Sequence, residues 1–523
     1  MQGFIKNQQI ILIILDGWGE SSKYHGNAIK QAKTPTLDFL WQNYPKSFLQ
    51  ASEKYVGLPN NQVGNSEVGH TTIGAGRTID QALVRISKSI QQGNLFHNNI
   101  LNQIYKKSNL NKSKVHLIGL CSNGGVHSHI DHLIALINIS KNYKNVKTLI
   151  HIITDGRDTK PQSAKTFIQT IFKNIKNHPY ITIGTISGRY YSMDRDCRWN
   201  RTEKAYNCLT SNETKEIYQN NINRVLEDNY KNNTFDEFIV PTRINPGKIE
   251  ENDGIIFFNF RPDRMRQLVQ PFCSRNFQAF KAKHIKNLNI TTFTVYDNQL
   301  NLPVIFNKMP KNNFLGQVIS ERGLKQFRLA ETEKYAHVTY FFNGGREEPF
   351  PGEDRELVSS PQVETYDITP NMSAINITKK LLHIDQNNQY KLIIVNYANA
   401  DMIGHTGNLL ATIKSIETID TCLKKILKNI NHNESTILIT ADHGNADVML
   451  DKNNEPCKSH TKNLVPFILL NTEIKKNRSS LISVGSLVDI APTILNLLNI
   501  KIPNEMDGQS LIITKSKKIN HRL

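Results

Sequence analysis

The feature that most constrains the fold is an alternation, along the whole chain, of short β-branched runs with longer amphipathic stretches. This alternation is typical of an α/β architecture with largely parallel sheets. Nearly all of the β-branched runs end in a cluster of polar residues. Because open α/β sheets bind ligands at the carboxyl ends of their strands, we expect the chemistry of the chain at those ends. The predicted strands are residues 10–16, 115–120, 148–155, 181–188, 254–260, 391–397 and 435–442.

Two helices and a terminal segment can also be read from the sequence. Thr34 and Pro35 predict the start of a helix, and residues 486–499 have helical apolar spacing. The basic residues 514–523 predict a frayed tail.

The composition limits the class of protein without identifying it. A length of 523 residues allows two or three domains. The 64 Lys and Arg against 46 Asp and Glu give a net charge of +18, which could indicate nucleic acid, a membrane surface or an anionic substrate. The lysines are dispersed, and no aromatic-plus-basic platform or helix-turn-helix pattern accompanies them. We therefore expect no nucleic-acid partner. Because of the charge of +18, a basic nucleic-acid-binding protein is nevertheless the alternative to an enzyme.

The cysteines and the apolar runs predict the compartment. The 6 cysteines show neither a Cys-x-x-Cys motif nor the spacing of a small disulfide domain, which indicates a reducing environment. The longest apolar runs, such as residues 10–15, are far shorter than the roughly 20 residues that span a bilayer. We expect a soluble, cytoplasmic protein with no membrane partner.

One group of strand-end residues contains only carboxylates and imidazoles. Asp401 and His405, at positions i and i+4, would share one face of a helix. Three Asp and three His without Cys favour divalent ions with mixed oxygen and nitrogen ligands, such as Mn²⁺ or Zn²⁺, and six ligands suggest two ions. The members are Asp16, Asp401, His405, Asp442, His443 and His460.

A second group of strand-end residues is rich in arginine. Guanidinium groups suit bidentate recognition of phosphate or carboxylate, and five that converge on one cleft would hold a small polyanion. This group predicts a second domain that binds an acidic metabolite. Its members are His127, Arg157, Asp158, Arg189, Arg195, Arg261 and Arg264.

Residues 64–69, GNSEVG, nearly spell the Gly-x-Ser-x-Gly turn that carries the nucleophile of α/β-hydrolases. The spacing differs by one residue, and no catalytic histidine of a hydrolase is evident. If Ser66 is a nucleophile, bound metal ions can activate it in place of a base, and the neighbouring His70 then has a structural role.

Ten motifs in register resemble the cofactor-independent phosphoglycerate mutases of the alkaline-phosphatase superfamily. Their order and approximate spacing hold from about residue 9 to residue 510. The motifs are LDGWG, GNSEVGH, GGVHSH, DGRDT, SGRYYSMDRD, NFRPDR, EKYAHVTYFFNGG, NYANADMIGHTG, TADHGNAD and SHT.

The resemblance implies a discontinuous, phosphatase-like metal-binding domain, residues 1–80 and 312–523, interrupted by an inserted α/β transferase and substrate-binding domain, residues 81–311. Hinges near 79–85 and 305–315 would let the domains close over the substrate. It implies that Lys334 joins the arginine group in binding substrate. It also implies one metal site formed by Asp401, His405 and His460, and a second formed by Asp16, Ser66, Asp442 and His443.

The implied reaction is the interconversion of 3-phosphoglycerate and 2-phosphoglycerate through a phosphoserine at Ser66. Asp158 would carry the proton between the glycerate hydroxyls, and Lys334 would add positive charge at the transferred phosphoryl group. The implied cofactors are two divalent ions, Mn²⁺ first and Co²⁺ or Zn²⁺ as alternatives, without 2,3-bisphosphoglycerate, in a monomer. Another metal-dependent phosphatase or a phosphopentomutase of the same superfamily is the alternative, and the arginine group argues against it.

Overall fold

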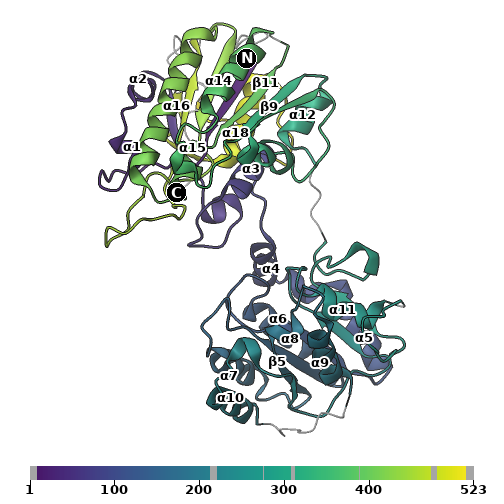
Figure 1. Ribbon diagram of the computed structural model, residues 1–523. Coiled ribbons are helices and arrows are strands. Elements are labelled where there is room, and N and C mark those ends of the chain that lie inside the picture. Colours follow the sequence, from purple (N-terminus) through teal and green to yellow (C-terminus); the bar gives the residue numbers. More distant parts are fainter. Residues whose placement is uncertain are drawn as a thin grey trace. The chain divides into compact units, whose positions relative to one another are not determined.

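The computed structural model describes residues 9–211, 221–274, 276–307, 312–387, 389–472 and 480–513. Residues 308–311 of the second predicted hinge and the predicted tail 514–523 lie outside these ranges. The chain divides into two compact units, each with its own sheet (Figure 1). Unit 1 comprises Met1–Gln81 and Pro310–Leu523, and unit 2 comprises Ala82–Met309. The predicted α/β fold class is confirmed.

Unit 1 contains an eight-stranded sheet in the order β10-β9-β11-β1-β12-β13-β2-β15. At its centre β1 pairs in parallel with β11 on one side and β12 on the other. All seven residues of β1 are buried, as expected for a strand covered on both faces. The strands are β1 (Gln9–Leu15), β2 (Lys46–Gln50), β9 (Gln326–Glu331), β10 (Glu353–Val358), β11 (Leu392–Tyr397), β12 (Ser435–Thr440), β13 (Val465–Leu470) and β15 (Val484–Ser486), with a separate pair β14 (Ser480–Leu481) and β16 (Ile512–Ile513).

The helices of unit 1 include α14 and α16, which contact each other and lie side by side over the sheet in Figure 1. Three short or medium helices, α3, α13 and α15, carry predicted site residues. The helices are α1 (Ala28–Gln31), α2 (Pro35–Asn43), α3 (Ser66–Ala75), α12 (Leu315–Glu321), α13 (Thr332–Ala336), α14 (Ala374–Gln386), α15 (Asn399–Gly404), α16 (Leu409–Asn429) and α18 (Ile490–Leu497).

Unit 2 contains a six-stranded sheet in the order β6-β5-β4-β3-β7-β8, parallel except for β6. Its strands are β3 (Val115–Leu120), β4 (Thr148–Thr154), β5 (Ile181–Gly188), β6 (Thr242–Arg243), β7 (Gly254–Phe257) and β8 (Asn289–Thr292). Its helices are α4 (Ala82–Gln91), α5 (Asn99–Leu110), α6 (Ile130–Ser140), α7 (Ala164–Ile175), α8 (Arg189–Ser192), α9 (Trp199–Thr210), α10 (Ile222–Lys231) and α11 (Arg266–Cys273).

All seven predicted strands are present, although β7 ends at Phe257, three residues earlier than predicted. The sequence reading missed β9, because Gln326, Arg328 and Glu331 interrupt its apolar residues. In the fold these polar side chains are buried, and Nη2 of Arg328 donates to Oε1 of Gln326 at 2.7 Å. The predicted helix over 486–499 is a 3₁₀ turn followed by α18.

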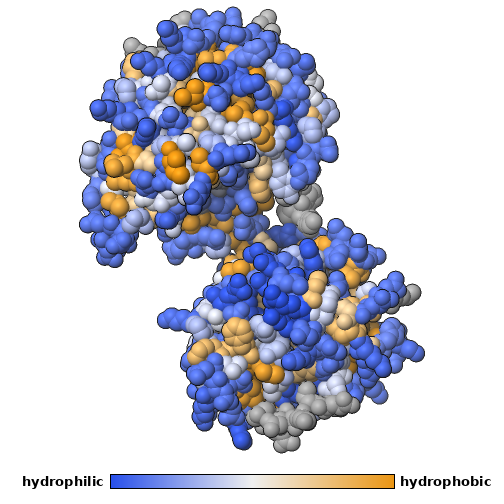
Figure 2. All heavy atoms as spheres, in the orientation of Figure 1, coloured by the Kyte–Doolittle hydropathy of each residue, from blue (hydrophilic) through white to orange (hydrophobic). Residues whose placement is uncertain are grey.

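In the view of Figure 2, hydrophilic side chains dominate both units, and apolar residues form separate patches. Within the described ranges, no helix combines the length and the apolar character needed to cross a membrane.

Besides His127 of the predicted site, unit 2 buries three further histidines among its described residues. Nδ1 of His116 lies 2.8 Å from Nε2 of His151, and Nε2 of His116 lies 3.0 Å from Oδ2 of Asp253. His132 is buried beside the ring of Phe260. Burial lowers the pKa of each imidazole because it penalises the charged form, and it lowers the pKa of His132 to about 3. These histidines are therefore neutral in the fold at neutral pH.

We expect acid to destabilise unit 2 through these groups. The folded pKa of His132 is below its unfolded value, so the unfolded chain binds more protons between pH 6.5 and about 3, and stability is lost as pH falls through that window. From pH 6.5 to 5 the loss for one such group is about 2 kcal/mol. Urea unfolding at both pH values should show that His132→Leu reduces this loss, whereas His97→Leu, at an exposed position, leaves it unchanged. Equal pH dependence in the two variants would contradict the assignment to His132.

Candidate active site

Three predicted metal ligands converge at the carboxyl end of β11. Asp401 lies in α15, the helix that follows this strand, and His405 follows it at position i+4. Nε2 of His405 lies 3.3 Å, and Nε2 of His460 3.2 Å, from Oδ1 of Asp401. The two Nε2 atoms are 3.0 Å apart.

The backbone fixes the orientation of both imidazole rings. Nδ1 of His405 lies 2.8 Å from the carbonyl oxygen of Lys458, and Nδ1 of His460 lies 2.9 Å from that of Gly64. A carbonyl oxygen only accepts, so each Nδ1 carries a hydrogen and each Nε2 turns a lone pair toward the other ring and Asp401. This arrangement is repulsive unless a cation binds there or a ring takes up a proton. The hydrogen bond with Asp401 is the largest cause that raises the pKa of His405. The donor set fits a divalent cation.

The second predicted set of ligands gathers at the carboxyl ends of β1 and β12. Asp16, Asp442 and His443 are fully buried. Nε2 of His443 lies 3.5 Å from Oδ1 of Asp16 and 3.5 Å from Oδ2 of Asp442, while Oγ of Ser66 lies 2.9 Å from the same nitrogen. The fold thus brings these four residues together, and they too fit a cation with mixed oxygen and nitrogen ligands.

Lys334 links the two sets. It lies on α13, directly after β9, and its ammonium group is buried. Nζ of Lys334 donates to Oδ1 of Asp16, Oγ of Ser66 and Oδ2 of Asp401, each at 2.7 Å. One lysine therefore contacts the predicted nucleophile and a carboxylate of each predicted metal site.

The charges of this cluster stabilise one another. Burial raises the pKa of Asp16, but Lys334 and the hydrogen bond with His443 outweigh it, so the net pKa lies well below the usual range. Burial lowers the pKa of Lys334, but Asp16, Asp401 and Asp442 raise it above the usual range. For His443 burial also lowers the pKa, while Asp442 and Asp16 raise it to about 9. Asp16 and Asp401 therefore stay ionised in the interior, because Lys334 and neighbouring imidazoles offset the cost of burial.

Ser66 opens α3, and the sequence shows why the helix begins there. Asn65 is the N-cap, and its side-chain oxygen accepts from the backbone N–H of Val68 at 2.9 Å. The hydroxyl of Ser66 thus stands at the start of a capped helix rather than on a strained turn.

Glycines let α3 approach its neighbours closely. A Cβ on Gly69 would lie 2.7 Å from the carbonyl oxygen of Asp442. A Cβ on Gly74 would lie 2.0 Å from the carbonyl oxygen of Phe342, which follows the π-helical turn His337–Phe341. There is no space for a side chain at either contact.

The sequence reading missed a polar bridge between two predicted ligands. Nδ2 of Asn396 donates to Oδ2 of Asp16 at 2.8 Å and lies 3.0 Å from Nε2 of His70. Nδ1 of His70 lies 3.2 Å from Oδ2 of Asp442 and 2.8 Å from the carbonyl oxygen of Ser66. His70 and Asn396 therefore hold Asp16 and Asp442 in position. Asn396 is the penultimate residue of β11, and the expectation of chemistry at strand ends could have identified it.

In unit 2, Arg189 is buried against two carboxylates. Its Nη1 donates to Oδ1 of Asp155 at 2.7 Å and to Oδ2 of Asp158 at 2.6 Å. Asp155 also accepts from the hydroxyl of Ser122 at 2.6 Å and from the backbone N–H groups of Arg157 and Asp158. The sequence reading placed Asp155 at the end of a strand without assigning it to the site, yet it anchors the DGRDT turn.

Three further residues of the predicted group face one carboxylate that the sequence reading also missed. Nη1 of Arg195 donates to Oδ2 of Asp263 at 2.8 Å, and Nε of Arg261 lies 3.2 Å from Oδ1. Nδ1 of His127 lies 3.7 Å from the same Oδ1. Burial is the largest of the causes that lower the pKa of His127, to about 4, so the ring is neutral at neutral pH.

The remaining arginines complete the group. Arg157 has a side chain that is 58% exposed, and Nη1 of Arg264 donates to the carbonyl oxygen of Met193 at 3.2 Å. Burial, followed by the charges of Arg195, Arg189 and Arg157, lowers the pKa of Arg264. The guanidinium group of Arg264 therefore lies close enough to those of Arg157, Arg189 and Arg195 for their charges to repel it.

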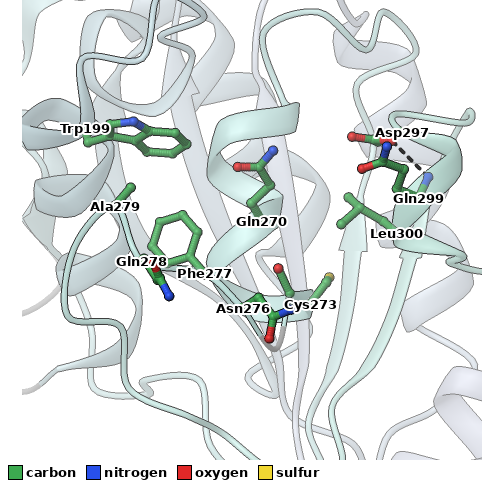
Figure 3. A pocket seen from close by; sticks show the side chains of 11 residues that line it. Trp199, Gln270, Cys273, Asn276, Phe277, Gln278, Ala279, Asp297, Gln299 and Leu300 are labelled. Carbon is green, nitrogen blue, oxygen red and sulfur yellow. Dashed lines mark hydrogen bonds between the residues drawn. The ribbon is translucent and has the colours of Figure 1, made fainter.

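A separate cavity of about 490 Å³ in unit 2 contains none of the predicted site residues. In Figure 3, Trp199 and Phe277 lie on one side, Asp297 and Leu300 on the other, and Gln270 between them. The two aromatic rings meet edge to face at 5.4 Å. Among the described residues, the lining contains the carboxylate of Asp297 and otherwise uncharged side chains.

Comparison with known proteins assigns the chain to a family. Residues 8–502 match the model of the metalloenzyme superfamily. A relative from Antithamnion sp., named 2,3-bisphosphoglycerate-independent phosphoglycerate mutase, is 59% identical over 503 residues, which cover 96% of this chain and 98% of the relative. One of the same name from Thermosynechococcus vestitus is 50% identical over 510 residues, 97% and 96% of the two chains. The chain belongs to the 2,3-bisphosphoglycerate-independent phosphoglycerate mutases.

A solved structure agrees with this assignment. The crystal structure of Leishmania mexicana phosphoglycerate mutase at low cobalt concentration is 26% identical, covers 98% of each chain and has a TM-score of 0.59. Membership in this family confirms the predicted resemblance and the predicted isomerase class, over the alternative of another phosphatase or a phosphopentomutase. Dependence on divalent metal follows from the metalloenzyme family.

We expect His405→Ala to weaken metal binding, because it removes one of the three potential ligands, Asp401, His405 and His460, whose ligand atoms lie close together. The metal content after dialysis, measured by inductively coupled plasma mass spectrometry, should fall, and the dissociation constant for Mn²⁺ should rise on the order of 100-fold. His383→Ala, at an exposed position of α14 in the same unit, is the matched control. An unchanged metal content in His405→Ala would refute this site.

Proposed function

We propose that this phosphoglycerate mutase transfers the phosphoryl group between O3 and O2 of glycerate through a phosphoserine at Ser66, with two divalent ions, Mn²⁺ first. The observation that carries the proposal is the environment of the hydroxyl of Ser66. It lies 2.7 Å from Nζ of Lys334 and 2.9 Å from Nε2 of His443, inside the cluster of buried carboxylates.

The proposed ligands are those predicted from the sequence. Asp401, His405 and His460 would hold one ion. Asp16, Ser66, Asp442 and His443 would hold the other. When bound, the ions would neutralise charge on the phosphoryl oxygens and lower the pKa of the serine hydroxyl.

In the first transfer Ser66 is the nucleophile. Its Oγ forms a bond to phosphorus as the bond from phosphorus to O3 of glycerate breaks. Nζ of Lys334, a donor to Oγ in the resting site, then donates to the phosphoryl oxygens as negative charge develops on them. Asn396 and His70 keep the neighbouring carboxylates in place during this step.

In the second transfer O2 of glycerate attacks the phosphoserine and Oγ of Ser66 leaves. The arginine group and His127 keep glycerate bound between the transfers, so that its other hydroxyl can be presented. Asp158, whose carboxylate accepts from Arg189 at 2.6 Å, is the proposed carrier of the proton between the two hydroxyls. Retention of glycerate is what makes the reaction an isomerisation without 2,3-bisphosphoglycerate.

Ser66→Ala should abolish the exchange, because no other hydroxyl replaces the nucleophile. We expect activity to fall more than about a thousandfold. Acid quenching of the wild type with 3-[³²P]phosphoglycerate should leave label on a peptide that contains Ser66, and the variant should carry none. Residual activity above a thousandth of wild type, or label elsewhere, would contradict the proposal.

Lys334→Met should lower kcat by roughly 10²- to 10³-fold, because it removes the charged donor from the phosphoryl group. Lys325→Met removes a lysine at an exposed position just before the same strand, and its kcat should stay near wild type. Steady-state kinetics with 3-phosphoglycerate at saturating Mn²⁺ distinguishes the two variants. Equal values of kcat would exclude a catalytic role for Lys334.

We also propose a monomer that acts in the cytoplasm. All six cysteines lie within the described residues and are free thiols, which suits a reducing compartment.

We further propose that unit 1 binds the metal ions and that unit 2 binds the substrate.

A further inference from the structure

Asp263 is the one acidic residue of the NFRPDR motif, and it faces three members of the proposed substrate group. Its Oδ2 accepts from Arg195 at 2.8 Å, and its Oδ1 lies 3.2 Å from Nε of Arg261 and 3.7 Å from Nδ1 of His127. The side chain of Asp263 is 28% exposed, and those of the two arginines are about half exposed. A carboxylate thus lies where the anionic substrate is proposed to bind.

Asp263 differs from Asp155, the other carboxylate that the sequence reading missed. Asp155 is buried and accepts from a hydroxyl, two backbone N–H groups and Arg189, so it is a structural anchor. Asp263 makes one hydrogen bond through its side chain, to Arg195, and within the described chain its Oδ1 has no hydrogen-bond partner. Asp263 therefore affects the electrostatic potential around the arginines more than it restrains their conformation.

The arginines retain donors for a ligand while Asp263 stays in place. A guanidinium group has five N–H donors, and Asp263 faces one nitrogen each of Arg195 and Arg261. An anion that binds these arginines experiences their attraction and the repulsion of Asp263 together. The repulsion grows with the charge of the ligand, so it penalises a bisphosphorylated anion more than a monophosphorylated one.

We propose that Asp263 determines the anion selectivity of this site: its carboxylate lowers the affinity of Arg195 and Arg261 for anions, and it does so most for the most highly charged ones, so that bisphosphorylated glycerate competes poorly with the less charged phosphoglycerate. The inference rests on the proposed substrate-binding role of the arginine group. It assigns to Asp263 a repulsive role rather than a direct contact with substrate.

The test uses the full chain with Mn²⁺ and the near-isosteric variant Asp263→Asn. Inhibition constants are measured for inorganic phosphate and for 2,3-bisphosphoglycerate, with 3-phosphoglycerate as substrate. The inhibition constant for phosphate should fall roughly fivefold, as expected for removal of one partly exposed charge partner. That for 2,3-bisphosphoglycerate should fall further. Unchanged or higher constants would show that Asp263 is a structural support, and would overturn the proposal.

Two variants separate charge from shape and from position. Asp263→Glu keeps the charge, so its inhibition constants should stay near wild type, and a fall like that of Asp263→Asn would overturn the proposal. Asp196→Asn removes an exposed carboxylate next to Arg198 on the same segment as Arg195 and should change neither constant. If Asp263→Asn does not fold, Asp263→Ser removes the same charge and is judged by the same outcomes.

Arg261→Ala distinguishes failure of this inference from failure of the proposed function. A rise in KM for 3-phosphoglycerate in Arg261→Ala supports the substrate role of the arginine group. In that case the inhibition constants of Asp263→Asn test the inference about Asp263 separately. An unchanged KM in Arg261→Ala would remove the substrate role itself, and the inference with it.

Discussion

The structure of unit 1 depends on the burial of three carboxylates, Asp16, Asp401 and Asp442, within one small volume. Ions taken out of water cost several kcal/mol each unless opposite charge compensates them. Lys334 supplies one positive charge at 2.7 Å from two of these carboxylates, and the imidazole of His443 supplies part of another. Divalent cations are the natural source of the rest. The parallel strands matter because they deliver these acids to one edge of the sheet.

In unit 2 the charges are reversed: cationic groups gather at the strand ends, and acidic side chains offset them. Its strand ends deliver guanidinium groups, whose mutual repulsion is relieved by acids of two kinds. Asp155 is fully bonded and fixes the geometry of Arg189. Asp263 is loosely bonded and moderates the charge of its neighbours. Under the proposed function, these acids would let the arginine group bind a phosphorylated substrate and still release the product.

The sequence predicted the seven central strands and the membership of both groups, because β-branched runs and the polar clusters after them are local signals. It did not predict β9, since buried Arg328 and Glu331 make that strand read as polar. It assigned His70 a structural role without its partners, and it missed Asn396 and the roles of Asp155 and Asp263. Their importance comes from partners distant in the chain, as between Asn396 and Asp16, and spacing within a motif cannot reveal such partners.

The contact between α3 and the π-helical turn His337–Phe341 has a consequence for how the enzyme can vary. Gly74 meets the main chain of Phe342 without room for a methyl group. Ser66 begins α3, and Lys334 lies in α13, which directly precedes the π-helical turn. The distance between Ser66 and Lys334 is therefore constrained by this contact between two main-chain segments. A side chain at position 74 would separate the two segments, so the geometry around Ser66 and Lys334 depends on a glycine that is not itself a proposed ligand.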